Sequence, residues 1–296
     1  MKTIRVRITA GETEAKRIAD VLERAFEDDG NPVSIYEASA DGKTWSAEIL
    51  LFDMEPDEAE ALVRDRVGAD AFAAPLDAEE LPDINWVEKS LEGLAPVRAG
   101  RFVVHGSHDR DKVPPAAIGL EIEAALAFGT GHHGTTAGCL DELDRLLAMR
   151  SYDSILDLGT GTGVLAIAAA HLARRPVLAT DIDPIATRTA AENARLNGVG
   201  PLVKTFTANG MEDRRFGEYG PFDLVIANIL ARPLMQMAKS IGAHCAATST
   251  LVLSGLRIED GPRILFAYRC QGFHLVRSRQ KDGWLTLTLV RGRKDA

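Results

Sequence analysis

The stretch "LDLGTGTGVLAI", residues 156–167, decides the fold. An apolar strand runs into three glycines, Gly159, Gly161 and Gly163, and an apolar helix follows. Glycine is favoured where the chain turns tightly and where a ligand must approach the backbone. The spacing G-x-G-x-G differs from the dinucleotide fingerprint G-x-G-x-x-G by one residue, so the motif alone does not exclude NAD. Without a following Gly-Lys-Ser/Thr it is not a P-loop.

Outward from this motif, strands and helices alternate from residue 151 to the end of the chain. Strands are expected at 154–159, 176–183, 202–209 and 222–229, with helices at 162–173, 184–198 and 231–245. Such alternation predicts a doubly wound α/β fold with a mostly parallel sheet. The last two strands, "FHLVRSRQ" and "WLTLTLVRG", are joined by a tight turn and must pair antiparallel.

The first 80 residues have a different pattern. Alternating residues 3–9, an amphipathic helix over 12–28, a hairpin around Asp41-Gly42, a helix over 55–67 and a last strand near 71–76 predict a ferredoxin-like α+β domain. Residues 81–100 are expected to be a linker with a short helix around Trp86. Residues 101–126 look strand-rich and are assigned to the second domain, 101–296.

Charge is distributed unevenly. The net charge is −9, and residues 1–80 contain 20 Asp or Glu and only 9 Lys or Arg. This acidic segment is either a solvated face or a surface that attracts a cationic partner. A direct grip on nucleic acid is not expected, because phosphate binding needs a basic patch. There is neither an apolar run of membrane-spanning length nor a signal-peptide core, and the three cysteines match no zinc pattern. We expect a cytoplasmic monomer.

Polar residues follow the predicted parallel strands. Asp181 ends the strand after the glycine motif, where an acid can bind ribose hydroxyls. Asp183, just before a proline, has an alternative role as a helix N-cap. Asp157 either orients the glycine loop or approaches a ligand's ammonium group. Asn228 ends another strand, and it either accepts hydrogen bonds from an amine substrate or caps the next helix.

The stretch "LAFGTGHHGTTAGCL", residues 126–140, contains adjacent histidines among glycines and threonines. No metal site is expected, because neighbouring residues seldom reach one ion and no Cys, His or acid cluster accompanies them. The glycines favour a loop that closes over a ligand. His133 is a candidate for positioning the loop or the substrate.

These motifs resemble class I S-adenosylmethionine-dependent methyltransferases over residues 151–296. The signature "GTGHHGTT" and "NILARPL", residues 228–234, make the chain similar to a narrower group, the PrmA family, which methylates large-subunit ribosomal protein L-eleven. The resemblance implies S-adenosylmethionine as cofactor and a basic large-subunit ribosomal protein as substrate, methylated on lysine side chains, the N-terminal α-amine, or both. It also implies a substrate-recognition role for residues 1–80.

The resemblance also assigns site residues. Its catalytic candidates are Asn228, Phe128 and His133. Gly134 departs from the family pattern, in which relatives often carry Pro or Glu. The cofactor-binding candidates are Thr136, Gly159, Asp181, Asn228, Thr130, Gly131, Gly161, Gly163 and Asp157.

Two other readings of the sequence remain open. The chain could be an NAD-dependent oxidoreductase on the same sheet, although it lacks a recognisable hydride-transfer constellation. It could also be a non-catalytic ribosome-assembly module, which the intact Gly159, Asp181 and Asn228 disfavour. A methylase of small molecules or of nucleic acid is a nearer competitor, and the net charge of −9 disfavours nucleic acid.

Overall fold

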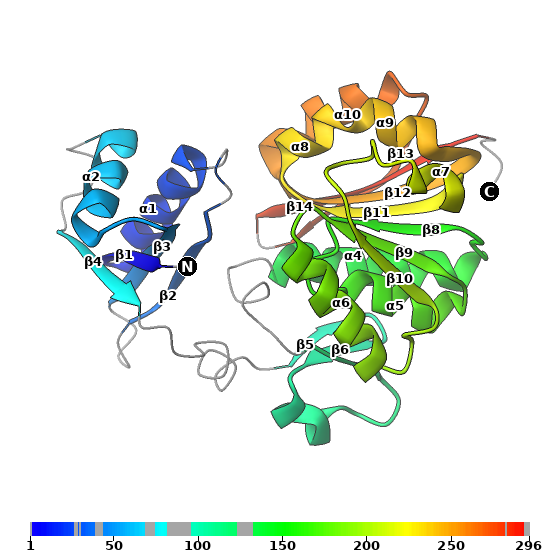
Figure 1. Ribbon diagram of the computed structural model, residues 1–296, viewed down its shortest axis with the longest axis horizontal. Helices are drawn as coiled ribbons and strands as arrows, with labels where there is room; N and C mark the ends of the chain where they lie inside the picture. The colour runs from blue at the N-terminus through cyan, green and yellow to red at the C-terminus, as the bar shows by residue number, and fades with distance from the viewer. Residues whose placement is uncertain are drawn as a thin grey trace. The chain divides into compact units, whose positions relative to one another are not determined.

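The computed structural model is shown in Figure 1. The described residues fall into two units, one built from residues up to 81 and the other from residue 96 onward. Each unit has its own hydrophobic core. The structure describes residues 2–26, 29, 31–38, 44–68, 75–81, 96–122, 133–281 and 283–292.

The first unit is a four-stranded antiparallel sheet with two helices on one face. The strand order is β2-β3-β1-β4, which is the ferredoxin-like arrangement expected from the sequence. Alternate residues of the central strand, Ile4, Val6 and Ile8, point into the core beneath both helices. The elements are β1 (Thr3–Ala10), α1 (Glu12–Ala25), β2 (Val33–Glu37), β3 (Trp45–Phe52), α2 (Pro56–Val67) and β4 (Leu76–Leu81).

The last strand of this unit lies further along the chain than predicted. It covers 76–81 instead of 71–76, and its sequence "LDAEEL" shows little apolar alternation. Polar partners on β1 explain this, because Arg5 pairs with Glu79 and Arg7 with Asp77 across the sheet. Cross-strand ion pairs of this kind support a strand that hydrophobic patterning does not reveal.

A small three-stranded sheet begins the second unit. Its order is β5-β6-β7, with β5 antiparallel and β7 parallel to β6. The strand at 97–99 falls inside the stretch 81–100 predicted to be a linker, so that prediction is wrong for these residues; Trp86 and its predicted helix lie outside the described residues. The elements are β5 (Val97–Ala99), β6 (Phe102–His105), a 3₁₀ helix η1 (Ser107–Lys112) and β7 (Ile118–Glu121).

The large sheet confirms the doubly wound fold. Its order is β10-β9-β8-β11-β12-β14-β13, in which the first five strands are parallel and the terminal pair is antiparallel. β8 is central and begins the glycine motif. The strands are β8 (Ile155–Leu158), β9 (Val177–Asp181), β10 (Val203–Thr207), β11 (Phe222–Asn228), β12 (Cys245–Arg257), β13 (His274–Lys281) and β14 (Trp284–Arg291).

Helices cover both faces of this sheet (Figure 1). Alternate residues of β8 serve the two cores: Ile155 packs with α4, α5 and α6, and Leu156 packs with the helices of the other face. The helices are α4 (His133–Met149), α5 (Val164–Ala173), α6 (Pro184–Leu196), α7 (Arg215–Tyr219), α8 (Ala231–Gln236), α9 (Ala238–His244), η3 (Ile258–Asp260) and α10 (Gly261–Arg269).

Three helical features differ from the prediction. The short helix α7 was not expected, and the helix expected over 231–245 is divided at Met237 into α8 and α9. The long helix α4 was missed because "GTTAGCL" looks like a loop. Gly138 lies within α4 and does not break it. A glycine is needed there because an added Cβ would lie 2.3 Å from the Thr286 Oγ1 atom. The glycine therefore lets α4 pack closely against β14.

Gly255 allows β12 to pass the end of β11. It has a φ of +78°, and an added Cβ would lie 2.5 Å from the backbone oxygen of Ile229. The β12–β14 register shifts between Leu253 and Leu256, around this residue. The close approach places β12 directly against the residue that follows Asn228.

We expect Gly255→Ala to destabilise the protein more than Gly283→Ala. Both glycines have positive φ, but an added Cβ at Gly283 meets no atom within 4 Å. Gly283→Ala, the control, should lower the free energy of unfolding by about 1–2 kcal/mol because of the left-handed conformation. Gly255→Ala should lower it by about 1–3 kcal/mol more because of overpacking. Equilibrium urea unfolding measures both, and equal losses would contradict the proposed close packing.

Candidate active site

The glycine loop between β8 and α5 is a tight turn tied to β9. Gly159, Gly161 and Gly163 have φ values of +74°, +54° and +85°, which L side chains rarely adopt. The amides of Gly159 and Thr160 both donate to the Thr180 carbonyl, at 2.8 and 2.9 Å. A Cβ on Gly159 would lie 2.3 Å from Ile229 Cγ2. Glycine is thus required where the loop passes β11.

Asp157 lies beneath this loop and is completely buried. Its Oδ2 accepts hydrogen bonds from Thr160 Oγ1 at 2.6 Å and from the Ala166 amide at 3.0 Å. Burial raises the pKa of Asp157 to about 7, with a smaller contribution from the Asp181 charge and in spite of the lowering effect of these two donors. Of the two roles considered for Asp157, these contacts favour orienting the glycine loop.

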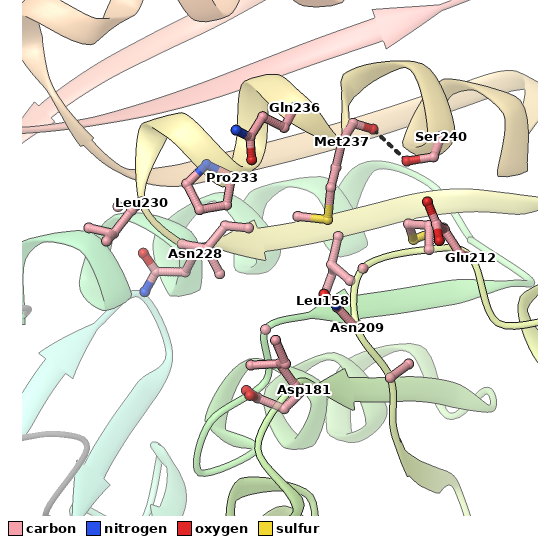
Figure 2. A pocket seen from close by; sticks show the side chains of 17 residues that line it. Leu158, Asp181, Asn209, Glu212, Asn228, Leu230, Pro233, Gln236, Met237 and Ser240 are labelled. Carbon is pink, nitrogen blue, oxygen red and sulfur yellow. Dashed lines mark hydrogen bonds between the residues drawn. The ribbon is translucent and has the colours of Figure 1, made fainter. Parts of the chain in front are cut away.

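A pocket of about 640 Å³ opens at the carboxyl ends of the parallel strands. It is bounded by Gly159 after β8, Asp181 at the end of β9 and Asn228 at the end of β11. Figure 2 shows Leu158 and Asn209 between the Asp181 and Asn228 ends of the pocket. This is the edge at which ligands bind in open α/β sheets.

Asp181 is held in place by backbone donors. Its Oδ2 accepts from the Gly161 amide at 2.9 Å, and its Oδ1 accepts from the Asp183 amide at 3.0 Å. The carboxylate therefore also fixes the glycine loop. Asp183 does cap α6, since it accepts from the Ile185 amide at 2.7 Å.

Asn228 lines the same pocket, at the opposite end from Asp181 (Figure 2). Its Nδ2 donates to Thr136 Oγ1 at 3.3 Å, and its buried Oδ1 has no hydrogen-bond partner among the described residues. The capping alternative for Asn228 is wrong, because the N-cap of α8 is Leu230. An unsatisfied buried amide oxygen is costly, and in a pocket it is available to accept a hydrogen bond from a ligand.

The structure thus brings Gly159, Asp181 and Asn228 into one pocket, and Thr136 joins them through Asn228. Gly161 and Gly163 belong to the loop behind the pocket. Phe128, Thr130 and Gly131 lie outside the described residues. His133 begins α4, but its side chain is not among the parts that the structure describes.

Sequence reasoning missed one side of the pocket. The loop after β10 and the helices α8 and α9 contribute a set that was not singled out: Asn209, Gly210, Met211, Glu212, Gln236, Met237 and Ser240. The signal was present, because Asn209-Gly210 follows a predicted parallel strand and so lies at the same edge as Asp181. The contribution of α8 and α9 depends on tertiary packing.

The buried Asp157 should make stability fall as pH rises. A folded-state pKa raised from 3.8 to about 7 means that the folded protein binds this proton more tightly than the unfolded chain between those values. The stability of the wild type relative to Asp157→Asn should therefore fall by about 2 kcal/mol from pH 5 to pH 8. Urea unfolding at both pH values measures it.

Asp213→Asn is the control for this experiment. The Arg215 side-chain hydrogen bond lowers the pKa of Asp213 to about 2, so this carboxyl is ionised at both pH values. Its substitution should leave the pH dependence between 5 and 8 unchanged. Parallel curves for the wild type and Asp157→Asn would contradict a proton held by Asp157.

Among the described residues, no helix is long and apolar enough to cross a membrane.

The family model for ribosomal protein L11 methyltransferase (PrmA) matches residues 2–292. A protein named ribosomal protein L11 methyltransferase from Sinorhizobium fredii is 49% identical over 291 residues, 98% of this chain and 100% of the relative. One from Brucella abortus strain S19 is 48% identical over 290 residues, 98% of this chain and 100% of the relative.

The solved structures agree with this. The crystal structure of a ribosomal protein L11 methylase from Lactobacillus delbrueckii subsp. bulgaricus matches with a TM-score of 0.57 and 26% identity, covering 68% of this chain and 99% of that one. The family match spans both units, and the glycine loop, Asp181 and Asn228 all lie within it. This chain belongs to the ribosomal protein L11 methyltransferase (PrmA) family.

Proposed function

We propose that this protein transfers methyl groups from S-adenosylmethionine to amines of a large-subunit ribosomal protein, as the names of its relatives imply for them. The acceptors are lysine side chains, the N-terminal α-amine, or both. The observation that carries the proposal is the unpartnered, buried Oδ1 of Asn228 in the pocket that also contains Asp181 and Gly159.

The pocket has the chemistry to hold S-adenosylmethionine. Asp181 offers carboxylate oxygens for the ribose hydroxyls, and Gly159 lets the backbone approach the ligand. An apolar wall for the adenine ring is provided by Leu158, Ile182 and Met211. Thr136, Gly161, Gly163 and Asp157 support this pocket from behind, and we assign Thr130 and Gly131 to the same site on the family resemblance.

Asn228 orients the acceptor amine in this proposal. When bound, S-adenosylmethionine supplies a methyl group on a positively charged sulfur, which is already a good electrophile. The amine nitrogen forms a bond to the methyl carbon, the carbon–sulfur pair stays on sulfur, and the amine proton passes to water. Asn228 Oδ1 accepts an N–H hydrogen bond, which aims the nitrogen lone pair. We add Phe128 and His133 as further positioning candidates.

The state of the amine matters for this chemistry. A lysine with a pKa near 10.4 is almost entirely protonated at neutral pH and must lose a proton before it attacks, whereas an α-amine with a pKa near 7.7–8.0 already has an appreciable neutral fraction. A neighbouring positive sulfur lowers the pKa of a lysine by repulsion between like charges. The site therefore needs alignment and exclusion of water more than a dedicated base.

Asn228→Ala should reduce kcat for methyl transfer by about 10²-fold, because the amine loses its orienting acceptor. Transfer of labelled methyl groups to isolated large-subunit ribosomal protein measures kcat. Ser240→Ala is the matched control: Ser240 also lines the pocket, but its hydroxyl donates to the Met237 carbonyl at 3.0 Å.

Calorimetric titration with S-adenosylmethionine completes this test, with NAD as the parallel ligand. We expect S-adenosylmethionine to bind both the wild type and Asn228→Ala. We expect NAD to bind neither protein. Binding of NAD instead would favour the oxidoreductase, and a variant that keeps most of the wild-type turnover would remove the role given to Asn228. Binding of S-adenosylmethionine without any transfer would favour the assembly module.

We further propose that residues 1–80 recognise the substrate, that the part of 81–100 between β4 and β5 connects the domains, and that 101–296 catalyse the reaction in a monomer. The support is charge. Residues 1–80 contain 20 acidic and 9 basic residues, and exposed Asp20, Asp57 and Asp65 lie on the two helices. Such a surface attracts a basic protein from solution.

Replacing Asp20, Asp57 and Asp65 together by Asn should raise KM for the protein substrate about three- to tenfold with kcat unchanged, because electrostatic attraction acts on encounter. The control neutralises three exposed acids of the second unit, Asp111, Glu192 and Glu259. The difference should shrink in high salt. Equal effects of the two triple variants would contradict substrate recognition by the first unit.

A further inference from the structure

Two carboxylates flank the glycine loop from different strands. Asp181, at the end of β9, lines the pocket and accepts the Gly161 amide. Asp157, on β8, is fully buried and holds the loop from beneath through Thr160. One oxygen of Asp157, Oδ1, has no hydrogen-bond partner among the described residues. The structure thus places an incompletely satisfied carboxyl close to the ligand pocket but shielded from solvent.

None of the described groups that influence the pKa of Asp157 is a cation. Asp181 from β9 adds a negative charge. The Cys139 thiol from α4 is near enough for the Asp157 charge to contribute to raising its pKa. The neighbouring strand β11 contributes Ile226 in register, and α5 contributes the Ala166 amide. Neither Ile226 nor Ala166 titrates. In this setting burial raises the pKa of Asp157 to about 7, so its charge is sensitive to any cation that enters the pocket.

We propose that Asp157 distinguishes the methyl donor from the spent product by charge, ionising when the positively charged sulfur of S-adenosylmethionine occupies the pocket. This inference rests on the proposed function. The donor carries a sulfonium, whereas S-adenosylhomocysteine carries a neutral sulfur; both carry the same ammonium and carboxylate. The sulfonium stabilises the carboxylate through the low-dielectric interior, without direct contact. Asp157 releases its proton when the donor binds.

The reaction then reverses this effect. Methyl transfer breaks the carbon–sulfur bond and removes the positive charge from sulfur, so the carboxylate again becomes costly beneath the loop and regains a proton from solvent. The ionised Asp157 therefore favours the donor over the product. The sign follows from linkage: binding that releases a proton strengthens as pH rises through the free-state pKa.

Calorimetry of the full-length wild type tests the inference. Each ligand is titrated at pH 7 in buffers of different ionisation enthalpy, which gives the number of protons exchanged. Because Asp157 is about half protonated at pH 7, S-adenosylmethionine should release up to about half a proton more than S-adenosylhomocysteine. The ligands' own α-amines titrate near this range, so their pKa values are measured separately and their share is subtracted.

Asp157→Asn is the matched variant, since the amide keeps an oxygen for Thr160 and Ala166 but cannot ionise. In the wild type, donor affinity relative to product affinity should rise by up to about tenfold from pH 6 to pH 8, and in the variant it should stay flat. A purely structural role would change both affinities without altering this slope.

The outcomes separate the two ideas. Equal proton exchange for donor and product in the wild type, after the amine correction, would overturn the charge discrimination while leaving methyl transfer in place. The same pH slope in Asp157→Asn would also overturn it. If S-adenosylmethionine did not bind at all, the proposed function itself would fail. If the variant does not fold, the wild-type comparison alone decides.

Discussion

The buried carboxylate of Asp157 is the interaction on which the catalytic unit depends. It ties the end of the central strand to Thr160 in the glycine loop and to the first turn of α5. A carboxyl group is costly to bury in an apolar interior, and the hydrogen-bond donors around it offset part of that cost. Without it the glycine loop would lose the hydrogen bond that holds Thr160 from beneath. The same residue therefore supports both the β8–α5 connection and the glycine loop beside the pocket.

A second set of buried polar contacts fixes the other wall of the site. Glu142 on α4 is almost fully buried and pairs with Arg145 on its own helix and with Arg277 on β13. It also accepts a hydrogen bond from Thr288 on β14 at 3.0 Å. These contacts lock α4 onto the antiparallel strand pair, and α4 carries the Thr136 hydroxyl that holds Asn228. The position of the Asn228 amide thus depends on residues far from it.

Much of this arrangement was predictable from the sequence. The glycine spacing, the acid at the end of the next strand and the alternation of elements predict the doubly wound sheet and place Gly159, Asp181 and Asn228 at one edge. These features are local, so pattern and spacing suffice. The N-cap role of Asp183 follows from the proline after it for the same reason.

What could not be predicted depends on tertiary contacts. The sequence pattern does not predict helix α4, because Gly138, which allows close packing on Thr286, is typical of a loop. It does not predict β4 at its observed position, because the residues that pair with β1 are charged. The break at Met237 and the contribution of α8 and α9 to the pocket have no local signal. The lack of a partner for the Asn228 oxygen is likewise visible only in three dimensions.

The order of strands in the large sheet has a consequence for how the protein acquires its site. β14 lies between β12 and β13, and α4 packs against it although the two are about 150 residues apart in the chain. Contacts of such long range are slow to form. The glycine loop is held by contacts to β9, the next strand in the chain, whereas the contacts that tie α4 to β14 require the last strand. The wall of the site that α4 builds is therefore secured by the end of the chain, whereas the glycine loop depends on segments close to it in sequence.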